Sequence, residues 1–448
     1  MDLEKKLEAY CQLCLRNNVI APALYAQYGV KRGLRDENAQ GVLTGLTNIS
    51  KIIASKTIDG VKHPCEGKLY YRGYDVEELI ADAVEENRCA FEEVSYLLLF
   101  GDLPTQAQLE EFKAILADKR DLPTNFTRDV IMKGPSKDIM NSLSKSVLTL
   151  ASYDPNAQDI SLPNVLNQCM KLISVFPMLA VYGYSAYNHY ERNKSFFIHK
   201  PDPKLSLAEN ILRMLRPDKK YTALEAQVLD IALILHMEHG GGNNSTFTTR
   251  VVTSAGSDTY SVVAAALSSL KGPRHGGANI KVVEMMEHIE SVLDSNDEDA
   301  LRRYLGEILD GNAFDGAGLI YGMGHAIYSK SDPRAKVFKG FVQRLALEKG
   351  EDKRYALYSA VERIAPEVIS AKRRMYKGVS ANVDFYSGLV YSMLGIPPEM
   401  FTPLFAIARI VGWSAHRIEE LSNPSKIMRP AYMSLSENRN RRPLATRE

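Results

Sequence analysis

The sequence predicts a protein that is almost entirely α-helical, with more than one domain and one short β-hairpin. Its 448 residues exceed what a single hydrophobic core usually serves, which is roughly 250–300 residues. Apolar residues recur at spacings of three and four along most of the chain, which is the period of an α-helix. The stretch 59–74 departs from this pattern, because its Gly- and Tyr-rich run GKLYYRGY is typical of a hairpin.

The predicted helix that follows Thr222 shows both of its ends in the sequence. Thr222 is the expected N-cap, and Glu225 three residues later completes a capping box. Residues 228–235 are apolar nearly all round, so we expect this helix to be buried. The glycines at 240–242 predict its end. Similar apolar segments predict further helices at 91–100, 164–187, 260–270, 278–293, 301–309, 354–369 and 403–421.

Two breaks divide the chain, at Gly272-Pro273 and at the run GIPP over 395–398. They bracket a segment of about 120 residues, which is a plausible domain size. A domain that enters and leaves a larger body at two neighbouring hinges could close over a cleft. The breaks therefore predict a hinged insert.

Composition excludes several classes of protein. Hydrophobic residues make up 45% and charged residues 24%, as in ordinary globular proteins, and the net charge of +1 favours neither nucleic acid nor an anionic membrane. No apolar run approaches the ~20 residues that a membrane span needs. The N-terminus has no apolar signal core, and the five scattered cysteines argue against a disulfide framework. We expect a cytoplasmic protein without nucleic-acid or membrane partners.

The motif GPRHGGAN, Gly272–Asn279, sets His275 between glycines at the start of a predicted helix. A histidine that merely packs in a core rarely needs three glycines within five positions. Glycines let the backbone approach a ligand closely, and a helix start offers unpaired N–H groups. The motif therefore favours a functional role for His275.

Two later motifs carry further candidates. His325 follows Gly322-Met323-Gly324, which lacks both the third glycine of a dinucleotide loop and the GK[ST] of a P-loop. This backbone could still lie against a flat or phosphorylated ligand; the alternative is a histidine that only packs. Asp384 has the apolar neighbours Val383 and Phe385, which can raise a carboxyl pKa toward that of a useful base. The alternative for Asp384 is a helix N-cap.

We expect His275, His325 and Asp384 to lie in loops rather than on helix faces. One carboxylate and two imidazoles suffice to remove a proton from carbon and to polarise two carbonyl oxygens. Together the three residues predict an enzyme.

Candidate anion ligands accompany them. Arg409 has Phe405 and Trp413 four residues to either side, and an arginine on such an apolar stripe must find an anion. That anion is either a ligand carboxylate, which guanidinium binds with two prongs, or an internal salt-bridge partner. His239 precedes three glycines and is read equally well as an anion ligand or as a buried histidine. The segment HMEH is not HExxH, so we predict no metal site.

The segments HMEHGGGNNSTFTTRVV, GPRHGGAN, GMGHAIYSKSDPR, NVDFYSG, LFAIARIVGW and KIMRP resemble, in this order, those of the citrate synthase family. LYYRGYDVEEL and LSLAENILRML resemble it too, so the resemblance runs from Gly41 onward. It implies a nearly all-helical homodimer with a large domain at 1–276 plus 396–448 and a small mobile domain at 277–395. It also implies condensation of acetyl-CoA with oxaloacetate and water to citrate and CoA through an enol, with CoA as a co-substrate and no permanently bound cofactor.

The resemblance also implies roles for single residues. Asp384 would take a methyl proton from acetyl-CoA, His275 would support the enol oxygen, and His325 would polarise the oxaloacetate carbonyl. The residues implied to hold the substrate dianion are His239, Arg334, Arg409 and, from the partner subunit, Arg429.

Contacts to CoA are implied for the backbone at Gly322 and Gly324 and for Asn382. Many bacterial relatives carry basic residues where this chain has Ala326 and Ser329. Lys330 is therefore the candidate for the CoA phosphates.

Two alternatives stay open. A 2-methylcitrate synthase would use propionyl-CoA with the same residues, and one extra methylene shifts selectivity by only ~1–3 kcal/mol. A non-catalytic helical protein that binds acyl-CoA or a dicarboxylate is the other, and the intact set of His275, His325 and Asp384 argues against it.

Overall fold

The computed structural model describes residues 3–35, 41–273, 275–293, 297–325, 327–373, 378–423, 426–441 and 443–446. These residues fall into two units, Met1–Thr47 and Asn48–Glu448. The first unit holds α1 (Leu3–Asn18) and α2 (Ala23–Gln27), and neither helix has a buried residue.

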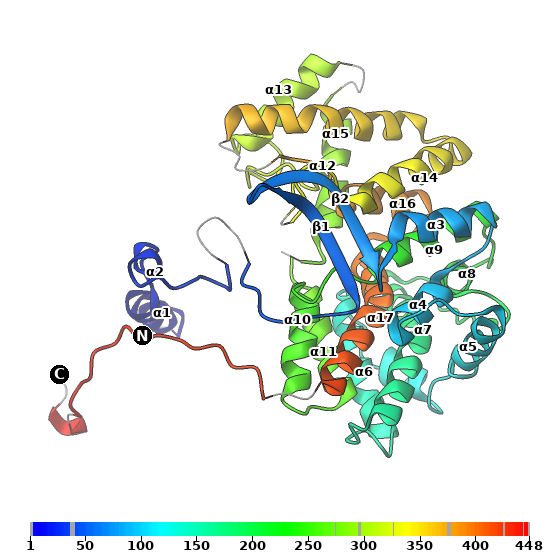
Figure 1. The fold of residues 1–448 in the computed structure, drawn as a ribbon, viewed down its shortest axis with the longest axis horizontal. Helices are drawn as coiled ribbons and strands as arrows, with labels where there is room; N and C mark the ends of the chain where they lie inside the picture. The colour runs from blue at the N-terminus through cyan, green and yellow to red at the C-terminus, as the bar shows by residue number, and fades with distance from the viewer. Residues whose placement is uncertain are drawn as a thin grey trace. The chain divides into compact units, whose positions relative to one another are not determined.

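The second unit is helical apart from one small sheet, which confirms the predicted all-α class (Figure 1). Its helices are α3 (Val76–Glu85), α4 (Phe91–Phe100), α5 (Gln106–Asp118), α6 (Ile139–Leu150), α7 (Leu162–Arg192), α8 (Leu207–Leu215), α9 (Ala223–His236), α10 (Asn244–Ser254), α11 (Thr259–Leu270), α12 (Ala278–Val292), α13 (Glu298–Leu309), α14 (Pro333–Lys349), α15 (Asp352–Lys372), α16 (Val383–Met393) and α17 (Phe401–Ser422). Every predicted helix is present, and most extend a few residues beyond the predicted bounds.

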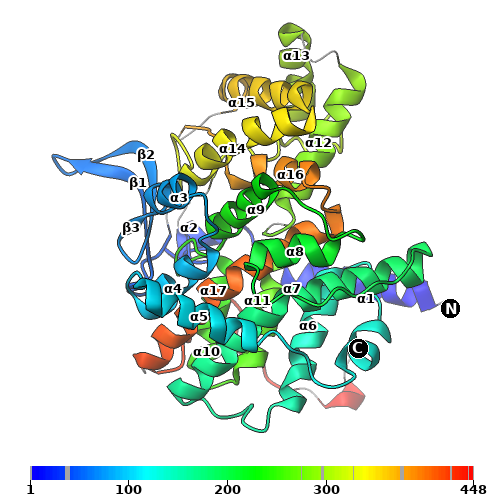
Figure 2. The same ribbon diagram turned by 90° about the vertical axis from the view of Figure 1, so that its right-hand side faces the viewer.

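The sheet contains the predicted hairpin, but the hairpin begins earlier than expected. Strands β1 (Ser50–Ile58), β2 (Val61–Tyr71) and β3 (Tyr74–Asp75) are antiparallel in the order β1-β2-β3. The turn lies at Asp59 and Gly60, which both have positive φ angles. The stretch 59–74 therefore supplies only the later strands. The tip of the hairpin projects beyond the helices in Figure 2.

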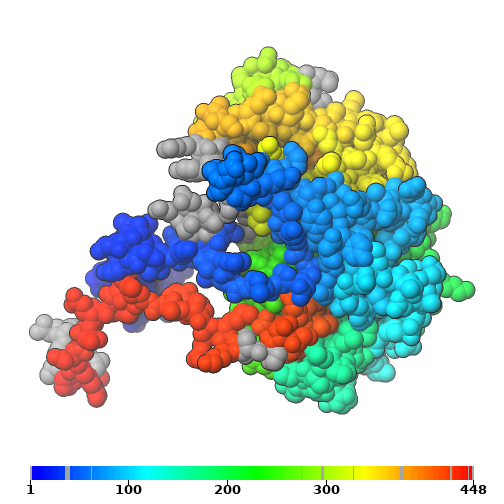
Figure 3. All heavy atoms as spheres, viewed as in Figure 1, coloured from blue at the N-terminus to red at the C-terminus, as the bar shows by residue number. Residues whose placement is uncertain are grey.

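Strand β2 packs against α14, and the blue hairpin adjoins yellow atoms at the surface in Figure 3. Gly67 N donates a hydrogen bond to Ser331 Oγ at 3.2 Å. A Cβ at Gly67 would lie 2.2 Å from Ser331 O and 2.7 Å from the Tyr328 ring. Only glycine permits this close approach.

Helix α9 begins as predicted. Glu225 N donates to Thr222 Oγ1 at 3.2 Å, and Thr222 N donates to Glu225 Oε2 at 2.8 Å, which completes the capping box. The predicted burial is also confirmed, because 228–235 is buried throughout.

The same helix ends four residues before Gly240, at His236, so the prediction that it runs to the glycines is wrong. Side chains from elsewhere occupy its last carbonyl groups: Arg409 Nε donates to His236 O at 2.6 Å, and Tyr71 Oη donates to Ile234 O at 3.0 Å. Helix ends need such partners. His239 consequently lies beyond the helix and does not share a helix face with His236.

Among the described residues, only α7 is long and apolar enough to cross a membrane by length and composition. This helix corrects the expectation that no apolar run approaches the length of a membrane span; in the sequence, Gln168 and Lys171 interrupt its apolar residues. Inside the fold, 78% of the most apolar window is buried. Packing against α6 and α17 accounts for this composition.

Helices α12 to α16 lie together in both ribbon views (Figures 1 and 2). They span the segment predicted as the small domain, 277–395. One hydrophobic core is continuous across both predicted hinges, since buried residues on either side belong to it. The domain boundaries therefore stay a prediction.

Candidate active site

The loop before α16, which leads to Asp384, is hydrogen-bonded to the loop that leads to His325. Gly324 N donates to Ser380 O at 2.7 Å, and Asn382 N donates to Gly322 O at 2.9 Å. Gly322 has a φ of 78°, and a Cβ there would lie 2.8 Å from the Phe385 ring. Packing within the protein thus accounts for Gly322, whereas the Cβ position of Gly324 faces open space.

Asp384 lies in the first turn of α16, so the prediction of a loop position is wrong. Asn382 is the N-cap, with Oδ1 accepting from Asp384 N at 2.9 Å, and the N-cap alternative for Asp384 is also wrong. Burial raises the pKa of the Asp384 carboxyl to about 6, although the positive charges of Arg334 and Arg409 oppose the shift. No described residue donates a hydrogen bond to this carboxylate, so it is available as a base.

His325 and Arg334 converge on one point. The Nδ1 atom of His325 accepts hydrogen bonds from Ile327 N at 3.0 Å and Tyr328 N at 3.1 Å, which assigns the ring proton to Nε2. Arg334 Nη2 lies 3.4 Å from that Nε2. Two donors that face one place suit an acceptor oxygen between them. The loop position predicted for His325 is confirmed.

Asp332 holds this arrangement together. It accepts from Arg334 Nε at 3.0 Å and Nη2 at 2.7 Å, and it caps α14. Its Oδ2 also accepts from Val383 N at 3.2 Å, at the start of α16. Burial opposes ionisation, but the Arg334 charge holds the pKa of Asp332 below its usual value. Asp332 is not among the residues predicted from the sequence, although an Asp directly before Pro333 is a recognisable signal of a helix start.

His239 presents an unpartnered nitrogen to the same region. Its side chain is buried, and its ring centroid lies 5.2 Å from that of His325 and 5.6 Å from that of Tyr328. Nε2 has no hydrogen-bond partner among the described residues. Burial and the Arg334 charge hold the pKa of His239 well below its usual value, so the ring is neutral near neutrality.

Arg409 is fully buried on α17, at 0% exposure. Nε donates to His236 O, while Nη1 and Nη2 are buried without partners in the described part of the chain. The Phe405 ring lies 4.7 Å from its Cζ. Burial lowers the pKa of Arg409 to about 10, so it is charged near neutrality. No described carboxylate pairs with it, which removes the internal salt-bridge alternative.

His275 lies in the predicted loop between α11 and α12. Its Nε2 is held by Asn243 Oδ1 at 3.1 Å and Ser245 Oγ at 3.2 Å. Its ring centroid is 6.3 Å from that of Phe405, the ring that also covers Arg409. Burial lowers the pKa of His275 to about 4, so the ring is neutral near neutrality. It can therefore act by hydrogen bonding but not as a cation.

Ring contacts, hydrogen bonds and shared partners thus bring six predicted residues into one region: His239, His275, His325, Arg334, Asp384 and Arg409. Lys330 and Arg429 are exposed, and neither bonds to these six among the described residues. Ser329 is buried, and Ala326 lies outside the described residues. The described residues contain no group of three or more His, Cys, Asp or Glu that could hold a metal ion.

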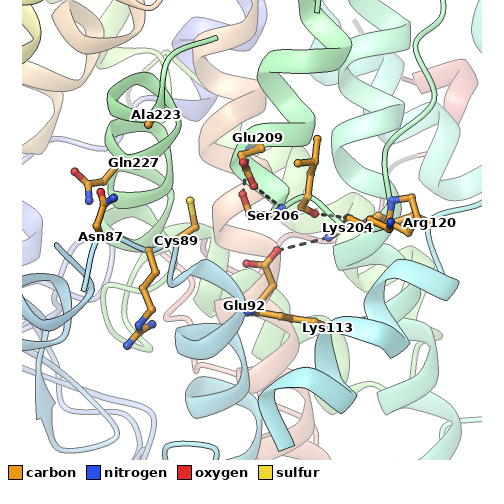
Figure 4. Close-up of a pocket in the computed structure, with 13 residues that line it drawn as sticks. Asn87, Cys89, Glu92, Lys113, Arg120, Lys204, Ser206, Glu209, Ala223 and Gln227 are labelled. Atoms are coloured by element: carbon orange, nitrogen blue, oxygen red, sulfur yellow. Dashed lines mark hydrogen bonds and ion pairs between the residues drawn. The ribbon is translucent and has the colours of Figure 1, made fainter. Parts of the chain in front are cut away.

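A cavity of about 320 Å³ lies elsewhere, between α4, α5, α8 and the start of α9 (Figure 4). It contains none of the predicted site residues. Its lining carries both signs of charge, and Glu92 and Arg120 lie 3.5 Å apart within it. The chemistry described above is therefore separate from this cavity.

Comparison with known proteins agrees with the fold and the site. The family model described as citrate synthase, C-terminal domain, matches residues 38–431. A citrate synthase from Synechocystis is 35% identical over 83% of this chain and 86% of its own. A 2-methylcitrate synthase from Shewanella oneidensis is 33% identical over 82% and 89%. The crystal structure of citrate synthase from Pyrobaculum aerophilum is similar with a TM-score of 0.73 and 31% identity, covering 92% of this chain and 95% of that one.

A second solved structure is a ternary complex of carboxymethyl coenzyme A and oxaloacetate with citrate synthase from Thermoplasma acidophilum. It gives a TM-score of 0.74 at 28% identity and covers 92% of this chain and 99% of that one. Fold, motifs and relatives define an acyltransferase that acts on an acyl-CoA donor. The chain belongs to the citrate synthase family. The alternative of a non-catalytic binding protein is therefore not supported.

The raised pKa of Asp384 predicts an acid limb of activity. A base must be deprotonated to act, so kcat/KM measured at low concentrations of both substrates should fall tenfold per pH unit below about pH 6. An Asp with its ordinary pKa would place that limb roughly two units lower. Activity that stays constant down to pH 5 would contradict the raised pKa of Asp384.

Proposed function

We propose that this chain is a citrate synthase, which condenses acetyl-CoA with oxaloacetate and water to give citrate and CoA. The observation that carries the proposal is the buried, charged guanidinium of Arg409 with two unpartnered Nη groups. An unpaired buried charge is costly, so a fold retains one where a ligand supplies the counter-charge. The Thermoplasma relative, bound to oxaloacetate and a CoA derivative, supports this choice of ligands.

Oxaloacetate is a dianion with a ketone, and the donors suit it. Arg409 and Arg334 supply positive charge, and guanidinium pairs with carboxylates in a two-pronged geometry. The neutral His239 adds a hydrogen bond. His325 directs its Nε2 proton toward the same place as Arg334, where the ketone oxygen would be polarised.

Asp384 removes a proton from the methyl group of acetyl-CoA. Because a thioester α-proton is far less acidic than a carboxylic acid, the base alone cannot form a free enolate. A hydrogen bond from His275 stabilises the developing oxygen charge once the enol oxygen replaces Asn243 Oδ1 as the acceptor of the imidazole proton. One such donor is often worth roughly 2.7–4 kcal/mol. The enol carbon then attacks the ketone carbon while His325 protonates its oxygen. Water finally hydrolyses the citryl thioester and releases CoA.

Several parts of the proposal concern partners. The backbone of Gly324 and Asn382 and the side chain of Lys330 lie near CoA, with Gly322 packed behind them. The active form is a homodimer in which Arg429 completes the oxaloacetate site of the partner subunit. The exposure of Arg429 in its own chain is compatible with this role. The enzyme needs no permanently bound cofactor and works in the cytoplasm.

A second candidate is 2-methylcitrate synthase, which uses propionyl-CoA. It is supported by relatives of that name at 32–33% identity, close to the 35% of relatives named citrate synthase. The two reactions differ by one methylene, which changes selectivity by only ~1–3 kcal/mol.

Thiol release with each acyl donor tests both candidates. We expect oxaloacetate-dependent release of CoA from acetyl-CoA, and slower release from propionyl-CoA. Reactions without oxaloacetate measure simple thioester hydrolysis and serve as the control. A strong preference for propionyl-CoA would replace citrate synthase by 2-methylcitrate synthase, and the absence of release from either donor would refute the condensation.

A further inference from the structure

Glu238 is a buried carboxylate that the proposed mechanism does not use. Its Oε1 accepts three hydrogen bonds, from Ser50 Oγ at 2.9 Å, from Gly240 N at 2.5 Å and from His416 Nε2 at 2.9 Å. Its Oε2 is buried and has no partner among the described residues. The exposure of the whole residue is 0%. A buried, ionised carboxylate with one oxygen that lacks a hydrogen-bond partner needs a structural or functional explanation.

Arg250 fixes His416 through the ring nitrogen that does not face Glu238. Arg250 donates to His416 Nδ1 from Nε at 3.1 Å, and its Nη2 lies 2.7 Å from the same atom. Arg250 also pairs with Glu419 and Glu420. Because Nδ1 is an acceptor, the ring proton lies on Nε2 and points to Glu238. The neutral imidazole therefore leaves the negative charge of Glu238 in place.

Glu238 and Arg409 lie against the same turn of α17. A Cβ at Gly412, three residues after Arg409, would lie 2.6 Å from Glu238 Oε2. Arg409 Nε bonds to the carbonyl of His236, two residues before Glu238. Opposite charges this close attract strongly when they are buried. Nevertheless, no ion pair joins the two side chains in the described structure. The hydrogen bonds to Oε1 therefore hold the Glu238 carboxylate away from the Arg409 guanidinium.

We propose that Glu238 is a positioning residue whose charge stabilises the buried Arg409 through space, while His416 and Arg250 keep its carboxylate from occupying the two Nη donors. The inference rests on the proposed function, in which those donors bind a carboxylate of oxaloacetate. A direct Glu238–Arg409 pair would compete with the substrate.

The charges around Arg409 agree with this role. Burial lowers its pKa, and Glu238 is the largest influence that opposes the shift. Tyr71 and Asp384 also favour its charged form, and Arg334 disfavours it. Arg409 in turn helps to lower the pKa values of the three neighbouring imidazoles, His236, His239 and His275. Glu238 is thus the main counter-charge of Arg409 when no substrate is bound.

Replacement of His416 tests the restraint in the full-length protein. In His416→Leu, Glu238 loses one of its three donors and keeps those of Ser50 and Gly240, and its carboxylate should turn onto Arg409. We expect the KM for oxaloacetate to rise about ten- to a hundredfold, since hydrogen bonds to charged groups are at stake, with kcat changed much less. His416→Gln, whose amide N–H can still donate, should stay near the parental KM.

The double variant His416→Leu/Glu238→Gln decides between restraint and simple structural damage. Without a carboxylate to compete, it should recover most of the lost affinity for oxaloacetate, measured both as KM and by calorimetry without an acyl donor. A double variant as weak as His416→Leu, or a parental KM in His416→Leu, would overturn the inference. If the parental protein itself neither binds nor converts oxaloacetate, the proposed function fails instead.

A second measurement needs only Glu238→Gln and so remains decisive if the His416 variants do not fold. Loss of the counter-charge should lower the pKa of Arg409, so the alkaline loss of oxaloacetate affinity should move to lower pH by about one unit or more. Affinity near neutrality should be retained. An alkaline limb at the parental pH would overturn the through-space role of Glu238.

Discussion

Replacement of Asp384 by asparagine is expected to lower kcat by about 10²- to 10⁴-fold, the usual contribution of a positioned general base. Asparagine has the same shape and can occupy the first turn of α16, but it cannot accept the methyl proton. The carboxylate accepts no hydrogen bond from a described residue, so its loss leaves no donor stranded. We expect the fold to be unchanged, as judged by the thermal midpoint.

Measurements of kcat and of oxaloacetate affinity should distinguish the loss of the base from a loss of substrate binding. Asp384→Asn should bind oxaloacetate at least as well as the parent, because a negative charge near Arg334 and Arg409 is removed. The control is Asp332→Asn, which loosens Arg334 and should raise the KM for oxaloacetate more than it lowers kcat. Thiol release and isothermal calorimetry measure the two effects. Near-parental kcat in Asp384→Asn would exclude it as the base.

Replacement of Arg409 by leucine is expected to weaken oxaloacetate binding by about 10²-fold or more, since a two-pronged charged contact is worth roughly 3 kcal/mol. The same change should lower the thermal midpoint only moderately. It removes the desolvation cost of a buried charge that has no ion-pair partner in the described structure, but it also leaves the buried Glu238 without its nearby counter-charge. A large loss of affinity with a small loss of stability would indicate a site kept for a ligand.

Arg417 provides the matched control on the same helix. It is also buried, but its guanidinium donates to Thr253 Oγ1 at 3.1 Å and Ser257 O at 2.9 Å. Arg417→Leu should therefore lower the thermal midpoint and leave the KM for oxaloacetate unchanged. Equal oxaloacetate affinity in Arg409→Leu and the parent would remove Arg409 from the site.

The positions of individual residues show how far local sequence reasoning reaches. The capping box of Thr222 and Glu225 and the loop position of His275 were predictable, because caps and glycine turns depend on residues a few positions apart. The end of α9 was not, since Arg409 and Tyr71 from distant parts of the chain occupy its last carbonyl groups. Asp384 was misplaced for a local reason, because Asn382, two residues earlier, is the N-cap of α16.

Glu238 and His416 show what the motifs could not indicate. Each acts through partners that are remote in sequence, because His416 joins Glu238 to Arg250. The glycine at 322 suggested a backbone that lies against a ligand. In the structure, the Phe385 ring fills the space beside Gly322.

By itself, the sequence determined the helical class, the hairpin, the family and the residues that could do chemistry, since these follow from local periodicity and from motifs in a fixed order. Only the tertiary structure decided which nitrogens of Arg409 and His239 stay unpartnered, and how far burial raises the pKa of Asp384. The physical reason is that burial and hydrogen-bond satisfaction depend on which distant segments meet, and no local pattern contains that information.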